Sequence, residues 1–148
     1  MDIVPSRLPL ASPYRSLLTL LEKRIFLPDI NLSYYHTLGI VLSVLYLYTR
    51  TPWLKVAIVV LVLGADWLDG ATARRYNRGS RAGYMIDVVT DRVSEAFIFS
   101  AESDTTIGQI FFLLWLVNLI LAFYSVHSNK HSSLPLRFVY LVILIARR

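Results

Sequence analysis

Four aspartates stand out in an otherwise apolar part of the sequence, Gly64–Arg92. Asp66 and Asp69 are three residues apart, and Asp87 and Asp91 are four apart. On a helix, either spacing places both side chains on the same face. An arginine-rich connector separates the two pairs. Carboxylates gathered in this way are typical ligands of hard divalent cations, and one of them can also accept a proton in catalysis.

The composition indicates what kind of protein carries these acids. The chain has 148 residues, of which 55% are hydrophobic and 17% are charged, and its mean hydropathy is +0.53. Soluble domains carry about 25% charged residues. Apolar runs bounded by charge clusters therefore predict a polytopic membrane protein and argue against a soluble domain. The absence of cysteine excludes disulfides and thiolate metal sites.

The apolar runs predict the elements that position the acids. We expect four membrane-crossing helices and a shorter fifth helix, at Leu32–Tyr48, Trp53–Arg74, Gly83–Ala101, Thr106–Val126 and Leu136–Ala146. The stretch Ser12–Phe26 is amphipathic and predicts a helix lying in the membrane interface; an ordinary helix packed on the bundle is the alternative. The expected fold class is an all-α, polytopic membrane helix bundle. Residues 1–30 form its juxtamembrane segment and residues 31–148 its transmembrane domain.

Basic residues predict the orientation of this bundle. The regions before the first span, between the second and third, and between the fourth and fifth carry most of them, including Arg74, Arg75, Arg78 and Arg81. The positive-inside rule places these regions in the cytoplasm, at the cell membrane. The net charge of +5 then reflects topology and affinity for anionic lipid. Nucleic acid is not an expected partner, because the basic residues flank spans.

The short connector between the second and third spans predicts antiparallel neighbours whose acidic faces converge. Each aspartate costs about 2.5–3.5 kcal/mol at the centre of a membrane span, and convergence adds repulsion. Bound divalent cations relieve both, and an oxygen-only ligand set favours Mg²⁺ or Mn²⁺ over Zn²⁺. Small residues, Gly70, Ala73 and Gly83, leave space beside the metals for a phosphate-bearing ligand, with Arg74 at the mouth.

The same stretch resembles the signature of the CDP-alcohol phosphotransferase family, D-x2-D-G-x2-A-R-x8-G-x3-D-x3-D. All eight fixed positions and all spacings agree; they are Asp66, Asp69, Gly70, Ala73, Arg74, Gly83, Asp87 and Asp91. The resemblance implies a six-span architecture, whose last part we expect to be shortened in this chain. It also implies a homodimer in which each protomer holds its own site.

The resemblance implies an activity as well. Such enzymes of phospholipid synthesis transfer a phosphatidyl-type group from a CDP-linked lipid to an alcohol, such as glycerol phosphate, inositol phosphate or serine, and release CMP. Two Mg²⁺ or Mn²⁺ ions would be bound, the first by Asp66, Asp69 and Asp87. Asp66, Asp87 and Asp91 would hold the second, and Asp91 would be the general base.

Further contacts follow from the same resemblance and from charge. The expected CDP-binding residues are Gly70, Ala73, Arg74, Ser80 and Gly83. A phosphate-bearing acceptor needs cations near the cytoplasmic mouth, and the candidates are Arg92, Lys130 and Arg137. The alternative for Lys130 and Arg137 is that they serve only the topology.

The remaining polar residues receive structural interpretations. Glu95, one turn beyond Asp91, is expected to be a polar packing group, and Asn118 an interhelical hydrogen-bonding residue. His36, His127 and His131 lie near span ends and are expected at the interface, not as metal ligands. A second class of function stays open, in which the acids form a cation site in a non-catalytic or ion-coupled membrane protein.

Overall fold

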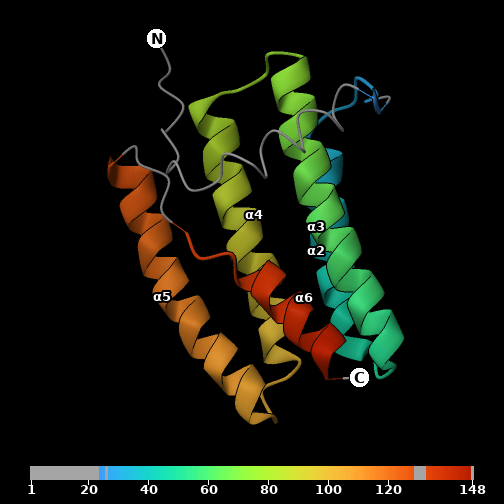
Figure 1. The fold of residues 1–148 in the computed structure, drawn as a ribbon. Coiled ribbons are helices and arrows are strands. Elements are labelled where there is room, and N and C mark those ends of the chain that lie inside the picture. The colour runs from blue at the N-terminus through green and yellow to red at the C-terminus, as the bar shows by residue number, and fades with distance from the viewer. Residues whose placement is uncertain (1–23, 26, 129–132, 148) are drawn as a thin grey trace.

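The computed structural model describes residues 24–25, 27–128 and 133–147, and all the regular structure in these ranges is helical. The helices in these ranges are α2 (Ser33–Tyr48), α3 (Pro52–Arg75), α4 (Arg81–Ser100), α5 (Thr106–Ser128) and α6 (Leu136–Ala146), and Figure 1 shows their arrangement. The all-α class is therefore confirmed, and each predicted helix lies within two residues of an observed one. The interfacial helix predicted at Ser12–Phe26 falls almost wholly outside the described residues.

Helices α3 and α5 are long and apolar enough to cross a membrane. The core helix of a soluble protein passes the same test, but its apolar residues are mostly buried. Here only 39% of the apolar window of α3 and 22% of that of α5 are buried. Large side chains on α5, such as Leu113, Ile120 and Phe123, point outward. Such a surface is suited to lipid. That α2 and α4 also cross the membrane stays a prediction.

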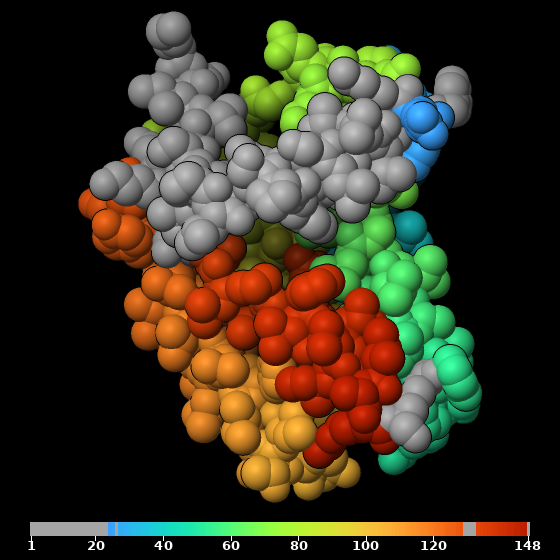
Figure 2. Space-filling view, in the orientation of Figure 1, coloured from blue at the N-terminus to red at the C-terminus, as the bar shows by residue number. Residues whose placement is uncertain are grey.

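The helices pack around α2 and α6. Helix α2 packs against both α3 and α4, α5 packs against α4, and α6 packs against α3 and α5. Figure 2 shows α6 lying across the face between α5 and α3. Helices α3 and α4 run antiparallel and their acidic faces converge on one space, as expected, but within the described residues they make few close contacts with each other, because α2 packs against both. Small residues explain why α2 approaches α4 closely: the hydroxyls of Ser43 and Ser94 are 2.6 Å apart and hydrogen-bonded.

The connector between α3 and α4 has defined geometry at both ends. Asn77 adopts a left-handed conformation (φ 53°), which asparagine tolerates. The backbone N–H of Arg78 then donates to the carbonyl of Ala73 (2.9 Å), closing the end of α3. Helix α4 begins where the side chain of Ser80 accepts a hydrogen bond from the N–H of Gly83 (3.0 Å). The connector therefore determines where α3 ends and where α4 begins.

The opposite end of the bundle is closed by a core of packed rings and a small polar network. The rings of Phe99, Phe111 and Tyr140 lie 5.1–5.5 Å apart, centre to centre. The Tyr46 hydroxyl donates to Glu102 (3.1 Å) and is hydrogen-bonded to the Tyr140 hydroxyl (2.9 Å). Lys55, in the first turn of α3, forms an ion pair with the same Glu102 carboxylate. These contacts join α2, α3, α6 and the turn that follows α4.

Candidate functional site

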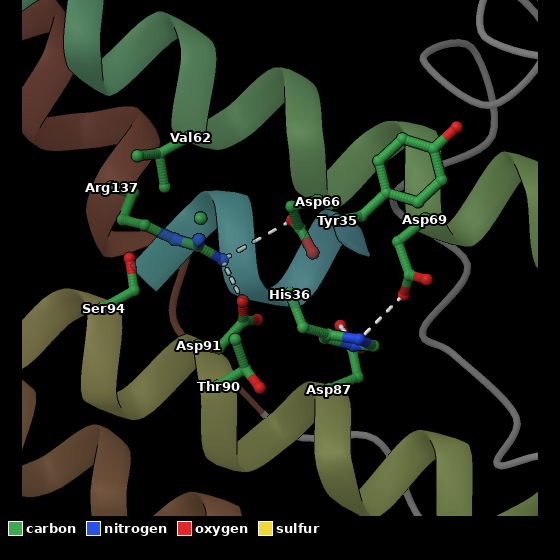
Figure 3. Close-up of a pocket in the computed structure, with 11 residues that line it drawn as sticks. Tyr35, His36, Val62, Asp66, Asp69, Asp87, Thr90, Asp91, Ser94 and Arg137 are labelled. Atoms are coloured by element: carbon green, nitrogen blue, oxygen red, sulfur yellow. Dashed lines mark hydrogen bonds and ion pairs between the residues drawn. The ribbon is translucent and has the colours of Figure 1, made fainter. Parts of the chain in front are cut away.

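The four aspartates line one cavity at the connector half of the bundle. Figure 3 shows Asp66 and Asp69 extending from α3 and Asp87 and Asp91 from α4, all toward the same space. Helix α2 forms a further wall, and the beginning of α6 closes the cavity. The lining residues are Tyr35, His36, Gly39, Val62, Asp66, Asp69, Asp87, Thr90, Asp91, Ser94 and Arg137.

The carboxylates form two overlapping groups. One oxygen from each of Asp66, Asp87 and Asp91 lies within 4.8 Å of the other two. Asp69 belongs to a second group, with Asp87 and His36, whose ligand atoms lie equally close. Asp87 is common to both groups. Because the oxygens come from separate helices, this convergence depends on the tertiary arrangement and not on local spacing alone.

Arg137, in the first turn of α6, inserts its guanidinium among the acids. Its Nη2 donates to Asp91 Oδ1 and to Asp66 Oδ2, the latter at 3.4 Å (Figure 3). The Arg137 side chain is 8% exposed, whereas the side chains of Asp91 and Asp66 are 22% and 36% exposed, so water screens the pair with Asp66 more than the pair with Asp91. With His36 neutral, the four aspartates of the cavity face this one guanidinium. The residues that line the cavity thus include more acidic than basic side chains, and the cation of Arg74 acts on Asp69 from outside this lining.

A buried network holds the beginning of α6 in place. The side-chain nitrogen of Asn118 donates to the carbonyl of Leu134 (3.2 Å), and its oxygen accepts from the Leu134 N–H (2.8 Å). The same nitrogen donates to Glu95 (3.3 Å), and Arg92 pairs with Glu95 from one turn earlier (3.0 Å). Asn118 and Glu95 are thus polar packing groups, and they position the segment that carries Arg137.

Arg92 is not placed where the sequence suggested. Its side chain is buried, lies against Glu95, and is not among the residues that line the cavity. Its backbone carbonyl accepts a hydrogen bond from Trp115 (2.8 Å), which ties α4 to α5. Lys130, the other candidate acceptor contact, lies outside the described residues. Of the two suggested acceptor cations that the structure describes, Arg137 lines the cavity and Arg92 does not.

The candidate CDP-binding residues lie beside the cavity, toward the connector, and none of them lines it. Arg74 folds back along α3 over Gly70, where an added Cβ would stand 3.1 Å from its Nη1. Ser80 caps α4, and its hydroxyl would stand 3.1 Å from a Cβ on Gly83. Ala73 is half-buried on the last turns of α3. Gly70 therefore makes room for the Arg74 guanidinium, and Gly83 for the Ser80 cap.

The structure also places in the cavity residues that sequence reasoning missed. His36 was expected at the interface, yet its Nε2 lies 3.4 Å from Asp69 Oδ2 and 3.9 Å from Asp87 Oδ1. A faint signal existed: Gly39 and Ser43 are small residues four apart, the kind of face on which helices pack closely. His36 precedes Gly39 by one turn and shares that face. Tyr35, Thr90 and Ser94 carried no such signal.

The donor set fits divalent cations. All four carboxylates offer hard oxygen ligands, and two of them can bridge neighbouring ions. Asp69 is only 7% exposed, and its Oδ1 has no hydrogen-bond partner among the described residues. A buried, unpaired carboxylate oxygen is costly unless a ligand satisfies it. The residues present are therefore suited to hold metal in this cavity.

Comparison with models of known protein families shows to which family the chain belongs. The family model for CDP-alcohol phosphatidyltransferase matches residues 26–147. The chain belongs to the CDP-alcohol phosphatidyltransferase family. Neither a curated protein nor a solved structure matched the chain.

Membership in this family gives the acidic cavity a chemical context. CDP-alcohol phosphatidyltransferases are transferases of phospholipid synthesis that act at membranes on CDP-alcohols and alcohol acceptors. They are typically dependent on divalent metal ions, which agrees with the clustered carboxylates.

Proposed function

We propose that the chain is an integral-membrane enzyme that transfers a phosphatidyl-type group from a CDP-linked lipid to an alcohol and releases CMP. The observation that carries the proposal is the match of all eight signature positions, combined with the convergence of their four aspartates on one cavity. Glycerol phosphate, inositol phosphate and serine are the acceptor types that we consider. The alternative, a cation site in a non-catalytic or ion-coupled membrane protein, would explain the four aspartates but not the other four signature positions.

The aspartates would hold two Mg²⁺ or Mn²⁺ ions. Asp66, Asp69 and Asp87 are assigned to the first, and Asp66, Asp87 and Asp91 to the second. Ions bound there would supply positive charge to the pyrophosphate and to the departing CMP. The excess of acidic over basic side chains in the lining supports this assignment, because such a cavity would otherwise repel an anionic substrate.

Asp91 is proposed as the general base. The acceptor hydroxyl oxygen would form a bond to the phosphorus that bears the lipid, while the bond from that phosphorus to the CMP oxygen breaks. The hydroxyl proton would pass to Asp91. Arg137 engages Asp91 Oδ1, and Arg92 Nη2 lies 4.0 Å from Asp91 Oδ2, so Oδ2 is the less tightly held oxygen and is the one proposed to receive the proton. Arg137 thereby orients the base.

The proposed substrate contacts lie on two sides of the acidic cavity. Gly70, Ala73, Arg74, Ser80 and Gly83 would form the CDP side, next to the connector. Arg137 would meet the phosphate of a phosphorylated acceptor, and Lys130 stays a second candidate for that role. We do not extend the proposal to Arg92, because Glu95 already pairs with its buried side chain.

The proposal includes an arrangement in the membrane. Residues 31–148 would form the catalytic transmembrane domain, and residues 1–30 an interfacial segment. By the positive-inside rule, the arginines at the connector, Arg74, Arg75, Arg78 and Arg81, support an orientation in which the cavity end would face the cytoplasmic side of the cell membrane. A homodimer is proposed from the family resemblance alone.

The direct test is CMP release by purified protein in lipid nanodiscs with CDP-diacylglycerol, Mg²⁺ and one acceptor at a time. We expect release with one acceptor class and none in EDTA. Asp91→Asn, which removes the proposed base, serves as the matched inactive control. If wild-type protein binds Mg²⁺ but neither binds nor turns over any CDP-linked lipid, the ion-coupled alternative becomes the better account.

A further inference from the structure

His36 is placed among the carboxylates by the packing of α2 against α3 and α4. Its Nε2 is the ring atom nearest the acids, 3.4 Å from Asp69 Oδ2 and 3.9 Å from Asp87 Oδ1 (Figure 3). The side chain is 13% exposed. It lies on the wall of the cavity opposite Arg137, so the two basic side chains meet different parts of the acidic cluster.

Two buried groups at this place are left without hydrogen bonds. Neither ring nitrogen of His36 makes one within the described part of the chain, and neither does Asp69 Oδ1. Polar atoms that are buried and unpaired destabilise a protein unless something satisfies them. The unpaired Nε2 of His36 lies in the lining of the cavity, 3.4 Å from Asp69 Oδ2, which indicates that a small, electron-poor ligand could satisfy both side chains.

The chemistry of the donors differs between the two groups around Asp87. Asp66, Asp87 and Asp91 offer only oxygen, whereas His36, Asp69 and Asp87 offer two oxygens and one imidazole nitrogen. Mg²⁺ strongly prefers oxygen ligands, and imidazole suits transition metal ions. The ring must bind through a deprotonated nitrogen, and Nε2 is the one that faces the acids.

We infer that His36 is a metal ligand, binding through Nε2 together with Asp69 and Asp87, and that it makes this position selective for a transition metal ion such as Mn²⁺ over Mg²⁺. The inference deepens the proposed function, on which it rests for the presence of metal in the cavity. The position held by Asp66, Asp87 and Asp91 keeps an oxygen-only ligand set. The two metal positions therefore differ in which metal ion they prefer, and Asp87 is a ligand at both.

The test uses the purified full chain with Mn²⁺ alone as the probe. Pulsed EPR detects the magnetic coupling between bound Mn²⁺ and the nitrogen of a directly coordinated imidazole. We expect this coupling in the wild type and a changed pattern when histidine is labelled with ¹⁵N. His36→Gln should abolish it and weaken Mn²⁺ binding at one position at least about tenfold. His127→Gln, which alters a histidine outside the cavity, should change neither.

A second substitution separates a ligand from a merely structural side chain. His36→Asp replaces nitrogen by oxygen, so metal binding should persist without nitrogen coupling, and the preference for Mn²⁺ over Mg²⁺ should fall. Wild-type protein that binds Mn²⁺ without nitrogen coupling, or that binds no Mn²⁺, overturns the inference whatever the variants do. Coupling in a protein that releases no CMP with any acceptor would support the His36 assignment and count against the proposed enzyme.

Discussion

Arg137 donates a hydrogen bond to Asp91 from a helix that begins 45 residues further along the chain. The same guanidinium contacts Asp66 on α3, so one side chain links the two acidic helices. Replacing it by Gln leaves two carboxylates facing each other. Breaking a buried ion pair in this way costs on the order of 3 kcal/mol, and divalent ions should restore part of that loss.

The prediction is therefore that Arg137→Gln lowers thermal stability much more in EDTA than in Mg²⁺. Thermal unfolding of both proteins in the same nanodiscs measures the difference. Arg147→Gln is the matched control, since Arg147 is an exposed arginine at the other end of α6. An equal loss with and without Mg²⁺ would show that Arg137 does not act as a counter-charge to metal ligands.

Asp91 and Asp69 should give different defects when each is changed to Asn. Asp91→Asn removes the proposed base, and turnover should fall at least about 100-fold while CDP-lipid binding survives. Asp69→Asn removes a ligand of the first metal, so Mg²⁺ and CDP-lipid affinities should fall together. CMP release and CDP-lipid affinity are measured for both variants at saturating Mg²⁺. Near wild-type turnover by Asp91→Asn would mean that another group takes the proton.

Gly70 and Gly64 offer a matched pair on α3. A Cβ on Gly70 would stand 3.1 Å from Arg74 Nη1, whereas a Cβ on Gly64 would meet nothing within 4 Å. Gly70→Ala should displace the flexible Arg74 side chain without harming the helix, because alanine favours helix. If Arg74 binds the CDP part, the KM for CDP-lipid rises about tenfold, equivalent to one charge-assisted hydrogen bond. Gly64→Ala should leave it unchanged. A KM unaffected by either substitution would separate Arg74 from substrate binding.

Asn118 should be important for stability and, through α6, for turnover. Asn118→Leu leaves both backbone groups of Leu134 without their partners and removes a donor from Glu95, which together should cost about 2–4 kcal/mol. Chemical unfolding in mixed micelles measures this cost, with the outward-facing Ile120→Ala as the control on the same helix. A loss below about 1 kcal/mol would mean that the connector before α6 is held by other contacts.

The orientation can be checked with single cysteines, because the chain has none of its own. Gly79→Cys lies in the exposed connector between α3 and α4, and Ser103→Cys in the exposed turn after α4. Gly79 does not have a positive φ, so its backbone accepts a side chain. In intact cells, a membrane-impermeant maleimide should label Ser103→Cys, whereas Gly79→Cys should react only after permeabilisation. The reverse pattern would place the acidic cavity on the outer side.

The sequence predicted the local part of the site well. Spacings of three and four residues put each aspartate pair on a helical face, and the apolar runs located the helices that carry them. Those features depend on helix geometry, which is set within a few residues. Contacts across the fold were harder to predict. The place of Arg137 depends on how the short α6 lies over α3 and α5, and no periodicity in the sequence specifies that.

Sequence reasoning misplaced both His36 and Arg92. His36 was not expected in the cavity and lines it, whereas Arg92 was expected at the site and does not line the cavity. His36 sits at the start of a helix and looked like an interfacial residue, but the rotation of α2 against its two neighbours turns it inward. Arg92 adjoins Asp91 in sequence and looked like a site residue, but consecutive residues on a helix point about 100° apart. Its side chain therefore turns to Glu95, one turn further on.

The two ends of the helix bundle differ in how their polar side chains are used. Lys55, Glu102, Tyr46 and Tyr140 are engaged with one another there. At the other end, acidic side chains outnumber basic ones among the residues that line the cavity. Polar side chains thus pair with one another at one end of the helices and line a cavity at the other. A cation could therefore bind at the cavity end, whereas the polar groups at the opposite end already hold the helices together.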